Sequence, residues 1–247
     1  MATNAFMVYD WLELRGRCDF YVALERPAKR VIAACVVYHD VGFDSIVFCG
    51  APKGIEAILA HLKPDKAVLP RVRPEELPSV LKALGPGADV KAYDTLLMTC
   101  DRASFRPVIA HEVVRLGPGH AGIFKHFCSE HLRRDITIGE AKRRLGDPEK
   151  PVFAVIEGGQ IASVAAIYLR LPEVSFVGSV FTVPEHRNKG LATSVVSRAT
   201  EEALSASEFA ALLVRSDNAP ALRVYGKIGY RPYRRLKWLS VGVDLRP

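Results

Sequence analysis

The stretch that decides the fold of the C-terminal half is VFTVPEHRNKGLAT, residues 180–193. It begins as a β-branched and aromatic run typical of a strand, and it breaks at Pro184, which cannot donate a hydrogen bond to a sheet. A short polar loop then leads to Gly190, and small residues open a helix that we expect from Leu191 to Ser205. The sequence therefore predicts a strand, a tight loop and a helix start.

This loop has the chemistry of an anion-binding site. The first amides of a helix have no intrahelical acceptor, and the helix dipole adds partial positive charge there. Gly190 lets the backbone approach a phosphate without a Cβ in between, and Ala192 keeps the first helical turn narrow. Arg187 and Lys189 add positive charge, although either side chain could equally point into solvent. A pyrophosphate fits these properties.

A second motif lies in DNAPALRVYGKIGY, residues 217–230. Together the two stretches resemble the GNAT superfamily of acyl-CoA N-acyltransferases. The signature of that family is Gln or Arg, two residues, Gly, one residue, then Gly or Ala, and Arg187, Gly190 and Ala192 match it. Members also carry an Asn, an Ala, a Tyr and a Gly-aromatic pair at fixed spacings, here Asn218, Ala221, Tyr225, Gly229 and Tyr230.

The resemblance covers roughly residues 111–247 and implies an α/β (α+β) fold, with a mixed, mostly antiparallel sheet flanked by helices. It also implies that acetyl-CoA or another acyl-CoA binds as co-substrate, and that no metal is used. The residues implied in cofactor binding are Val180, Phe181, Thr182, Arg187, Asn188, Lys189, Gly190, Leu191, Ala192, Thr193 and Asn218. By its position before a helix, Asn218 is equally an N-cap candidate.

Tyr225 is the implied catalytic residue. It returns to nearly the same helix face as Asn218 two turns earlier, and from the residues alone it could be a packed aromatic. The resemblance implies that its hydroxyl protonates the departing CoA thiolate as general acid. A neutral amine would attack the thioester directly, and a backbone N–H near residues 180–182 would hold the oxyanion.

The general base is not evident from the sequence. Some relatives place a glutamate five residues before the asparagine, where this chain has Leu213. Glu173, His186 and a chain of water molecules remain as candidates. Fold and cofactor loop do not identify the acceptor either, so an amine-bearing small molecule and a protein amine are both open.

The N-terminal half repeats the order strand, strand, strand, helix, strand, helix, strand that we expect in the C-terminal half. This indicates an internal duplication, with two tandem GNAT-like domains at 1–106 and 107–247. Residues 48–55 stand where the phosphate loop should be, and they lack its spacing. We expect a degenerate first domain that shapes the acceptor pocket or an interface. The chain is expected to end in a strand pair within Arg231 to Val243.

Composition narrows the classes of protein function that remain. A net charge of +7 is spread over short clusters, without the basic stripe and interleaved aromatics of a nucleic-acid-binding surface. Five cysteines in largely apolar surroundings predict buried thiols in a reducing compartment. With no apolar run long enough for a membrane span or signal peptide, we expect a cytoplasmic protein and leave its oligomeric state open. The alternatives to an acetyltransferase are an enzyme for longer acyl-CoA and a non-catalytic CoA-binding module.

Overall fold

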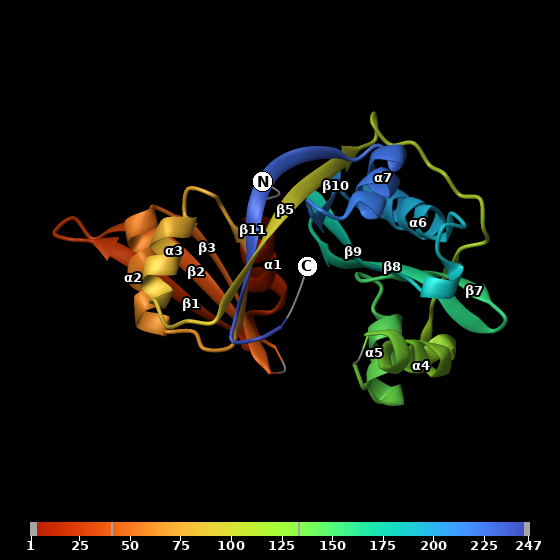
Figure 1. Ribbon diagram of the computed structural model, residues 1–247, viewed down its shortest axis with the longest axis horizontal. Coiled ribbons are helices and arrows are strands. Elements are labelled where there is room, and N and C mark those ends of the chain that lie inside the picture. Colours follow the sequence, from red (N-terminus) through yellow and green to blue (C-terminus); the bar gives the residue numbers. More distant parts are fainter. Residues whose placement is uncertain (1–3, 41, 133, 245–247) are drawn as a thin grey trace. The chain divides into compact units, whose positions relative to one another are not determined.

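The computed structural model describes residues 4–40, 42–132 and 134–244 (Figure 1). The chain forms two compact units. Unit 1 comprises Met1–Leu97, Leu213–Asp217 and Tyr233–Pro247, and unit 2 comprises Met98–Leu212 and Asn218–Pro232. The division thus differs from the single cut after residue 106 that the sequence indicates, because two late segments join unit 1.

Unit 1 is a mixed sheet with helices on both faces. Its elements are α1 Ala5–Glu13, β1 Cys18–Glu25, β2 Arg30–Asp40, β3 Phe43–Gly50, α2 Pro52–Leu62, β4 Ala67–Val72, α3 Leu77–Leu84 and β5 Val90–Asp101. The first three strands form an antiparallel meander, and β4 runs parallel to β3. The apolar stripe of α2, with Ile55 and Leu59, packs on Val37 and Ile46 of the sheet.

The sequence analysis missed α1. This helix packs against β2 and β3. Val36 and Val47 point to the opposite face from Val37 and Ile46, and they are buried as well. A strand buried on both faces reads as a continuous apolar run, so its sequence gives no sign that a second helix is needed.

Unit 2 is also built on mixed strand pairing. Its elements are β6 Val114–Arg115, α4 Ala121–Leu132, α5 Ile138–Gly146, β7 Val152–Glu157, β8 Gln160–Arg170, β9 Val174–Thr182, α6 Leu191–Ala206, the first part of β10 Phe209–Arg215, and α7 Ala219–Ile228. The last strand, β11 Arg231–Val241, begins in unit 2 and belongs to unit 1 from Tyr233 on. The strand order is β10-β9-β8-β7-β6, with β9 and β10 parallel and the other pairs antiparallel. Helices α4 and α5 lie over one face and α6 over the other (Figure 1).

The same order of elements occurs twice, as β1-β2-β3-α2-β4-α3-β5 and as β7-β8-β9-α6-β10-α7-β11. The pairing in each half is also alike: two antiparallel pairs, then a parallel pair. The expected strand pair at the end of the chain is wrong. A single strand, β11, runs through this region and pairs with β4, with Leu239 opposite Leu69 and Val241 opposite Ala67.

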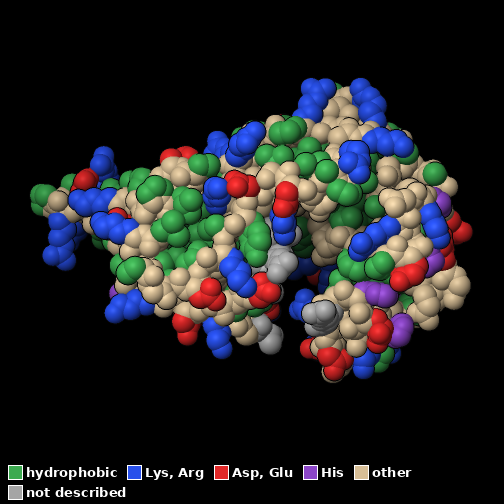
Figure 2. Space-filling model, viewed as in Figure 1, with side chains coloured by type: hydrophobic (Ala, Val, Ile, Leu, Met, Phe, Trp, Pro, Cys, Tyr) green, Lys and Arg blue, Asp and Glu red, His purple; other side chains and the backbone are tan. Residues whose placement is uncertain are grey.

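The segment before β6 is tied to α6: Val108 N–H donates to Ser197 Oγ and Ala110 N–H to Ser194 Oγ, each at 3.1 Å. The five cysteines are all free, but Cys18 and Cys49 are only half-buried. On the face shown in Figure 2, basic and acidic side chains are interspersed. Among the described residues, no helix is long and apolar enough to span a bilayer.

Gly229 ends α7 at a place where a side chain has no room. Its φ is +110°, and a Cβ there would lie 2.0 Å from the carbonyl oxygen of Ser104. We predict that Gly229→Ala lowers the free energy of unfolding by about 2 kcal/mol or more, from backbone strain and overpacking. Gly226→Ala, in the open interior of the same helix, should raise it by roughly 0.5 to 1 kcal/mol. Urea unfolding compares the two, and equal stabilities would contradict the close approach at Ser104.

Candidate functional site

The second half of β9 leaves its neighbour β10. The two strands pair only at Phe209 with Val174, Ala210 with Ser175, and Ala211 with Phe176. The side chains of β9 are buried where the strands pair, and those of residues 180–182, beyond the pairs, are half-exposed. A strand edge that leaves its partner presents backbone N–H and C=O groups that can bind an extended ligand.

A bulge in β9 lies just before this free edge. Against β8, Phe181 pairs with Val164 and Gly178 with Ala166, so two residues of β9 face one residue of β8. Ser179, in this interval, has a φ of +51°, which is unusual for a residue with a side chain. Bulges bend a strand and redirect the groups that follow. Here the redirected groups are those of Val180 to Thr182.

The loop after β9 has the geometry of an anion cradle. A 3₁₀ turn, η4 Pro184–His186, leads to Asn188 and Gly190, whose φ values of +63° and +85° are left-handed. The first helical bond of α6 runs from Ser194 N–H to the Gly190 carbonyl at 3.2 Å. The amides of residues 191–193 therefore have no acceptor within the helix.

Two side chains fix this loop. Arg187 Nε donates to the Thr182 carbonyl at 3.2 Å, which ties the loop back to β9. His111 Nε2 donates to the Lys189 carbonyl at 2.8 Å, and its ring also lies beside Gly190, 3.6 Å from where a Cβ would stand. The sequence analysis did not identify His111, because the chain separates it from the loop by many residues and no local pattern marks it.

The expected cofactor-binding residues differ in what they expose. Asn188, Lys189 and Gly190 are exposed, and Val180 to Thr182 are half-exposed. The side chains of Leu191 and Thr193 are buried, at 1% and 8% exposure, so these residues can offer a ligand little more than their amides.

Helix α7 carries the other two predicted residues. Asn218 is its N-cap, as predicted, and its Oδ1 accepts from Ala221 N–H at 3.2 Å. Tyr225 lies two turns later, 6% exposed and with its ring edge-on to Tyr230 at 6.0 Å. Burial raises the pKa of Tyr225 to about 12. Its hydroxyl therefore stays protonated, and able to donate, throughout the neutral pH range.

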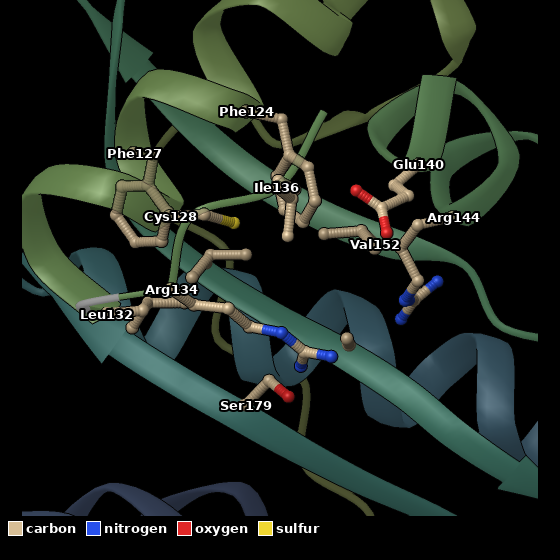
Figure 3. A pocket seen from close by; sticks show the side chains of 12 residues that line it. Phe124, Phe127, Cys128, Leu132, Arg134, Ile136, Glu140, Arg144, Val152 and Ser179 are labelled. Carbon is tan, nitrogen blue, oxygen red and sulfur yellow. The ribbon is translucent and has the colours of Figure 1, made fainter. Parts of the chain in front are cut away.

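A pocket of about 270 Å³ opens between helices α4 and α5 and the sheet (Figure 3). Most of its lining is apolar, including Phe124, Phe127 and Ile136. The Arg134 side chain extends over Ser179, the residue at the bulge of β9. The pocket therefore borders the strand segment that presents free backbone groups.

An aromatic cluster stands beside this pocket. His131 of α4 stacks on Phe181 of β9, with ring centroids 5.9 Å apart and planes 26° apart, and Phe127 meets Phe181 edge-on at 5.7 Å. His131 is thus a titratable group on the pocket side of the free strand edge. Sequence reasoning missed it, because a histidine on an amphipathic helix has no distinguishing pattern.

Two of the general-base candidates from the sequence lie at different distances from the free edge of β9. Glu173 precedes the first residue of β9, and the strand residues 174–179 separate it from Val180 by roughly 20 Å, too far for proton transfer. His186 is adjacent to the loop, where its Nδ1 lies 2.6 Å from a carboxylate oxygen of Glu157.

The equivalent segment of unit 1 is built differently. Helix α2 begins with Pro52, which has no N–H, and Gly54 N–H donates to the Ala51 carbonyl at 2.9 Å. A Cβ on Gly54 would lie 2.7 Å from that of Ala33, so this helix start is pressed against β2. It has no left-handed loop like the one before α6, and Lys53 alone of its first three residues keeps a backbone N–H without an acceptor in the helix.

Comparisons with known proteins agree with this arrangement. Residues 155–239 match the family model of FR47-like proteins. No curated protein is detectably similar to the chain in sequence.

Solved structures share the fold across both units. A GCN5-related N-acetyltransferase from Kribbella flavida has a TM-score of 0.69 at 14% identity, over 98% of this chain and 95% of that one. One from Sphaerobacter thermophilus has a TM-score of 0.64 at 16% identity, over 97% and 87%. A tandem GNAT protein from the clavulanic acid biosynthesis pathway has a TM-score of 0.59 at 16% identity, over 98% and 89%. At such low sequence identity, the structural similarity establishes the fold alone.

Proposed function

From its GNAT fold and C-terminal GNAT-like domain, we propose that the chain is an N-acyltransferase that uses acetyl-CoA and acetylates a small amine in unit 2. One observation carries the proposal. The bulge at Ser179 borders the pocket between α4, α5 and the sheet, and the strand that follows it leads directly into the anion cradle before α6. A donor and an acceptor bound at these two places would meet at Val180 to Thr182.

The residues present fit CoA. The amides of residues 191–193 and the left-handed turn at Asn188 and Gly190 would hold the pyrophosphate, with Lys189 beside them. The free edge of β9 would pair with the pantetheine arm, and one of its N–H groups would hold the thioester oxygen. The bound thioester supplies the activated acyl group, and the protein supplies orientation and proton handling.

Tyr225 serves the leaving group. A phenol with a pKa of about 12 is a weaker acid than a thiol, whose ordinary pKa is about 8.5. The hydroxyl therefore acts by donating a hydrogen bond to the sulfur as negative charge develops and the carbon–sulfur bond breaks, and CoA leaves as the thiolate.

His131 serves the attacking amine. An amine must lose its proton before or during attack, and the acceptor pocket needs a base on its side of the strand. The stack of His131 on Phe181 fixes the ring there, close to the strand segment that would hold the thioester. Neutral imidazole accepts the proton directly or through one water molecule.

Gly190→Asp tests the anion cradle. The substitution adds a negative charge and a side chain where the pyrophosphate would lie, so CoA binding should weaken at least about 100-fold. Gly85→Asp is the control for an added charge and side chain at a glycine of positive φ away from the loop, because Gly85 has a φ of +84° and open space around it. Calorimetry with CoA measures both. Equal affinities for the two variants would contradict the assignment of the loop.

Tyr225→Phe tests the leaving-group role. The variant keeps the ring and its packing, so CoA affinity should change little, while turnover should fall by about 100-fold or more. Thiol release with an accepted amine gives the rate. Because the pKa of Tyr225 is raised, the wild-type enzyme should not lose activity through ionisation of this hydroxyl below about pH 11. Retention of more than about a third of the turnover would exclude the role.

His131→Gln tests the base. Turnover should drop by roughly 100-fold, because the attacking amine loses its proton acceptor. His126→Gln is the control, since His126 is an exposed histidine on the same helix, whereas His131 stacks on Phe181. Wild-type turnover in the His131 variant, or an equal loss in the His126 variant, would rule His131 out as the base.

A further inference from the structure

Unit 1 contains a cavity of its own, of about 470 Å³. One wall is the end of β3, with Val47, Phe48, Cys49 and Gly50. The charged side chains that line it are Arg71 at the end of β4, Arg73 and Glu76 beyond that strand, and Arg234 of β11. This cavity is separate from the pocket in unit 2, and none of the proposed catalytic residues lines it.

The cavity lies where two parallel strands separate. β3 and β4 pair at Asp44 with Ala67 and at Ser45 with Val68, and the pairing then stops. The same happens between β9 and β10 in unit 2, where we propose that the thioester binds. Both units repeat one topology, and in each the parallel third and fourth strands stop pairing after a few residues. In unit 1 a cavity lined by arginines lies at this place.

Each of the three guanidinium groups is held in place. Arg71 is 6% exposed and lies over the ring of Phe6, 3.9 Å from its centroid. Arg234 lies over the ring of Tyr233, 5.8 Å from its centroid. Such contacts fix long side chains before a ligand arrives, so less conformational entropy is lost on binding.

Arg73 is fixed by a buried carboxylate. Its Nε donates to Glu76 Oε1 at 2.7 Å and its backbone N–H to Glu76 Oε2 at 2.8 Å, while its Nη2 reaches the Gly50 carbonyl at 3.3 Å. Glu76 is 1% exposed, and it is the one acidic residue among the side chains that line the cavity. Glu75 also lies 3.7 Å from Arg73 Nε, so Arg73 reaches the cavity already paired, and Arg71 and Arg234 add two further guanidinium groups to its lining.

We infer that this cavity is a second ligand site, which takes a small molecule bearing a carboxylate or phosphate group. Planar guanidinium forks match the oxygen pairs of both groups, and Val47 and Phe48 offer an apolar surface to the rest of the molecule. The start of α2 has Pro52 at its first position and a hydrogen-bonded amide at Gly54, so the pyrophosphate of CoA does not find here the row of free amides that α6 offers. The site therefore selects a different ligand from unit 2.

Calorimetric titration of the full chain with succinate, and separately with inorganic phosphate, tests this site at low ionic strength. We expect saturable binding of at least one of the two, and their relative affinity distinguishes a carboxylate ligand from a phosphate ligand. Arg234→Gln should weaken the binding about tenfold or more, as expected for the loss of a charge-assisted hydrogen bond. Arg71→Lys keeps the charge but loses the planar fork, and it should weaken binding as well.

Two controls locate the binding. Arg235→Gln removes the same charge from the neighbouring strand residue, which is exposed and does not line the cavity, so its effect should stay within about twofold. Gly190→Asp blocks the loop of unit 2 and should leave this binding intact. Absence of saturable binding of both anions, an Arg235→Gln effect equal to that of Arg234→Gln, or loss of binding in Gly190→Asp would overturn the inference.

Discussion

The separation of β9 from β10 is the constraint on which the rest of unit 2 depends. Parallel pairing holds for three residue pairs and then stops, because the bulge at Ser179 turns the strand aside. A sheet edge in the middle of a domain would ordinarily leave polar backbone groups unsatisfied. Here the edge is only half-buried, it ends in a loop tied back to it by Arg187, and it lies beside a pocket.

The repeated topology shows which features of each unit come from the fold and which come from individual residues. In both units the parallel third and fourth strands stop pairing after a few residues. In unit 2 the strand leads into a left-handed turn and a helix with free amides. In unit 1 the helix starts at Pro52 and is pressed onto β2 through Gly54, while arginines line the cavity at the end of β3. The two binding chemistries that we propose thus share one architecture and differ in a few residues at the strand ends.

Sequence reasoning reached the features that are encoded locally. The loop before α6 and the N-cap at Asn218 depend on residues a few positions apart, so their spacing identifies them. His111, His131 and the arginines of unit 1 act through contacts between distant segments, and no local spacing marks them. The helix α1 and the continuous strand β11 were not predicted for the same reason, since contacts with distant segments stabilise each of them.

The central claim is that the chain binds acyl-CoA in unit 2 alone. Calorimetric titration of the full chain with CoA measures this directly through the number of sites. The account predicts one site per chain, because within residues 4–40, 42–132 and 134–244 only the loop from Asn188 to Thr193 combines left-handed turns with a row of free helix amides. Two equivalent sites, or a single site that survives Gly190→Asp with unchanged affinity, would contradict it.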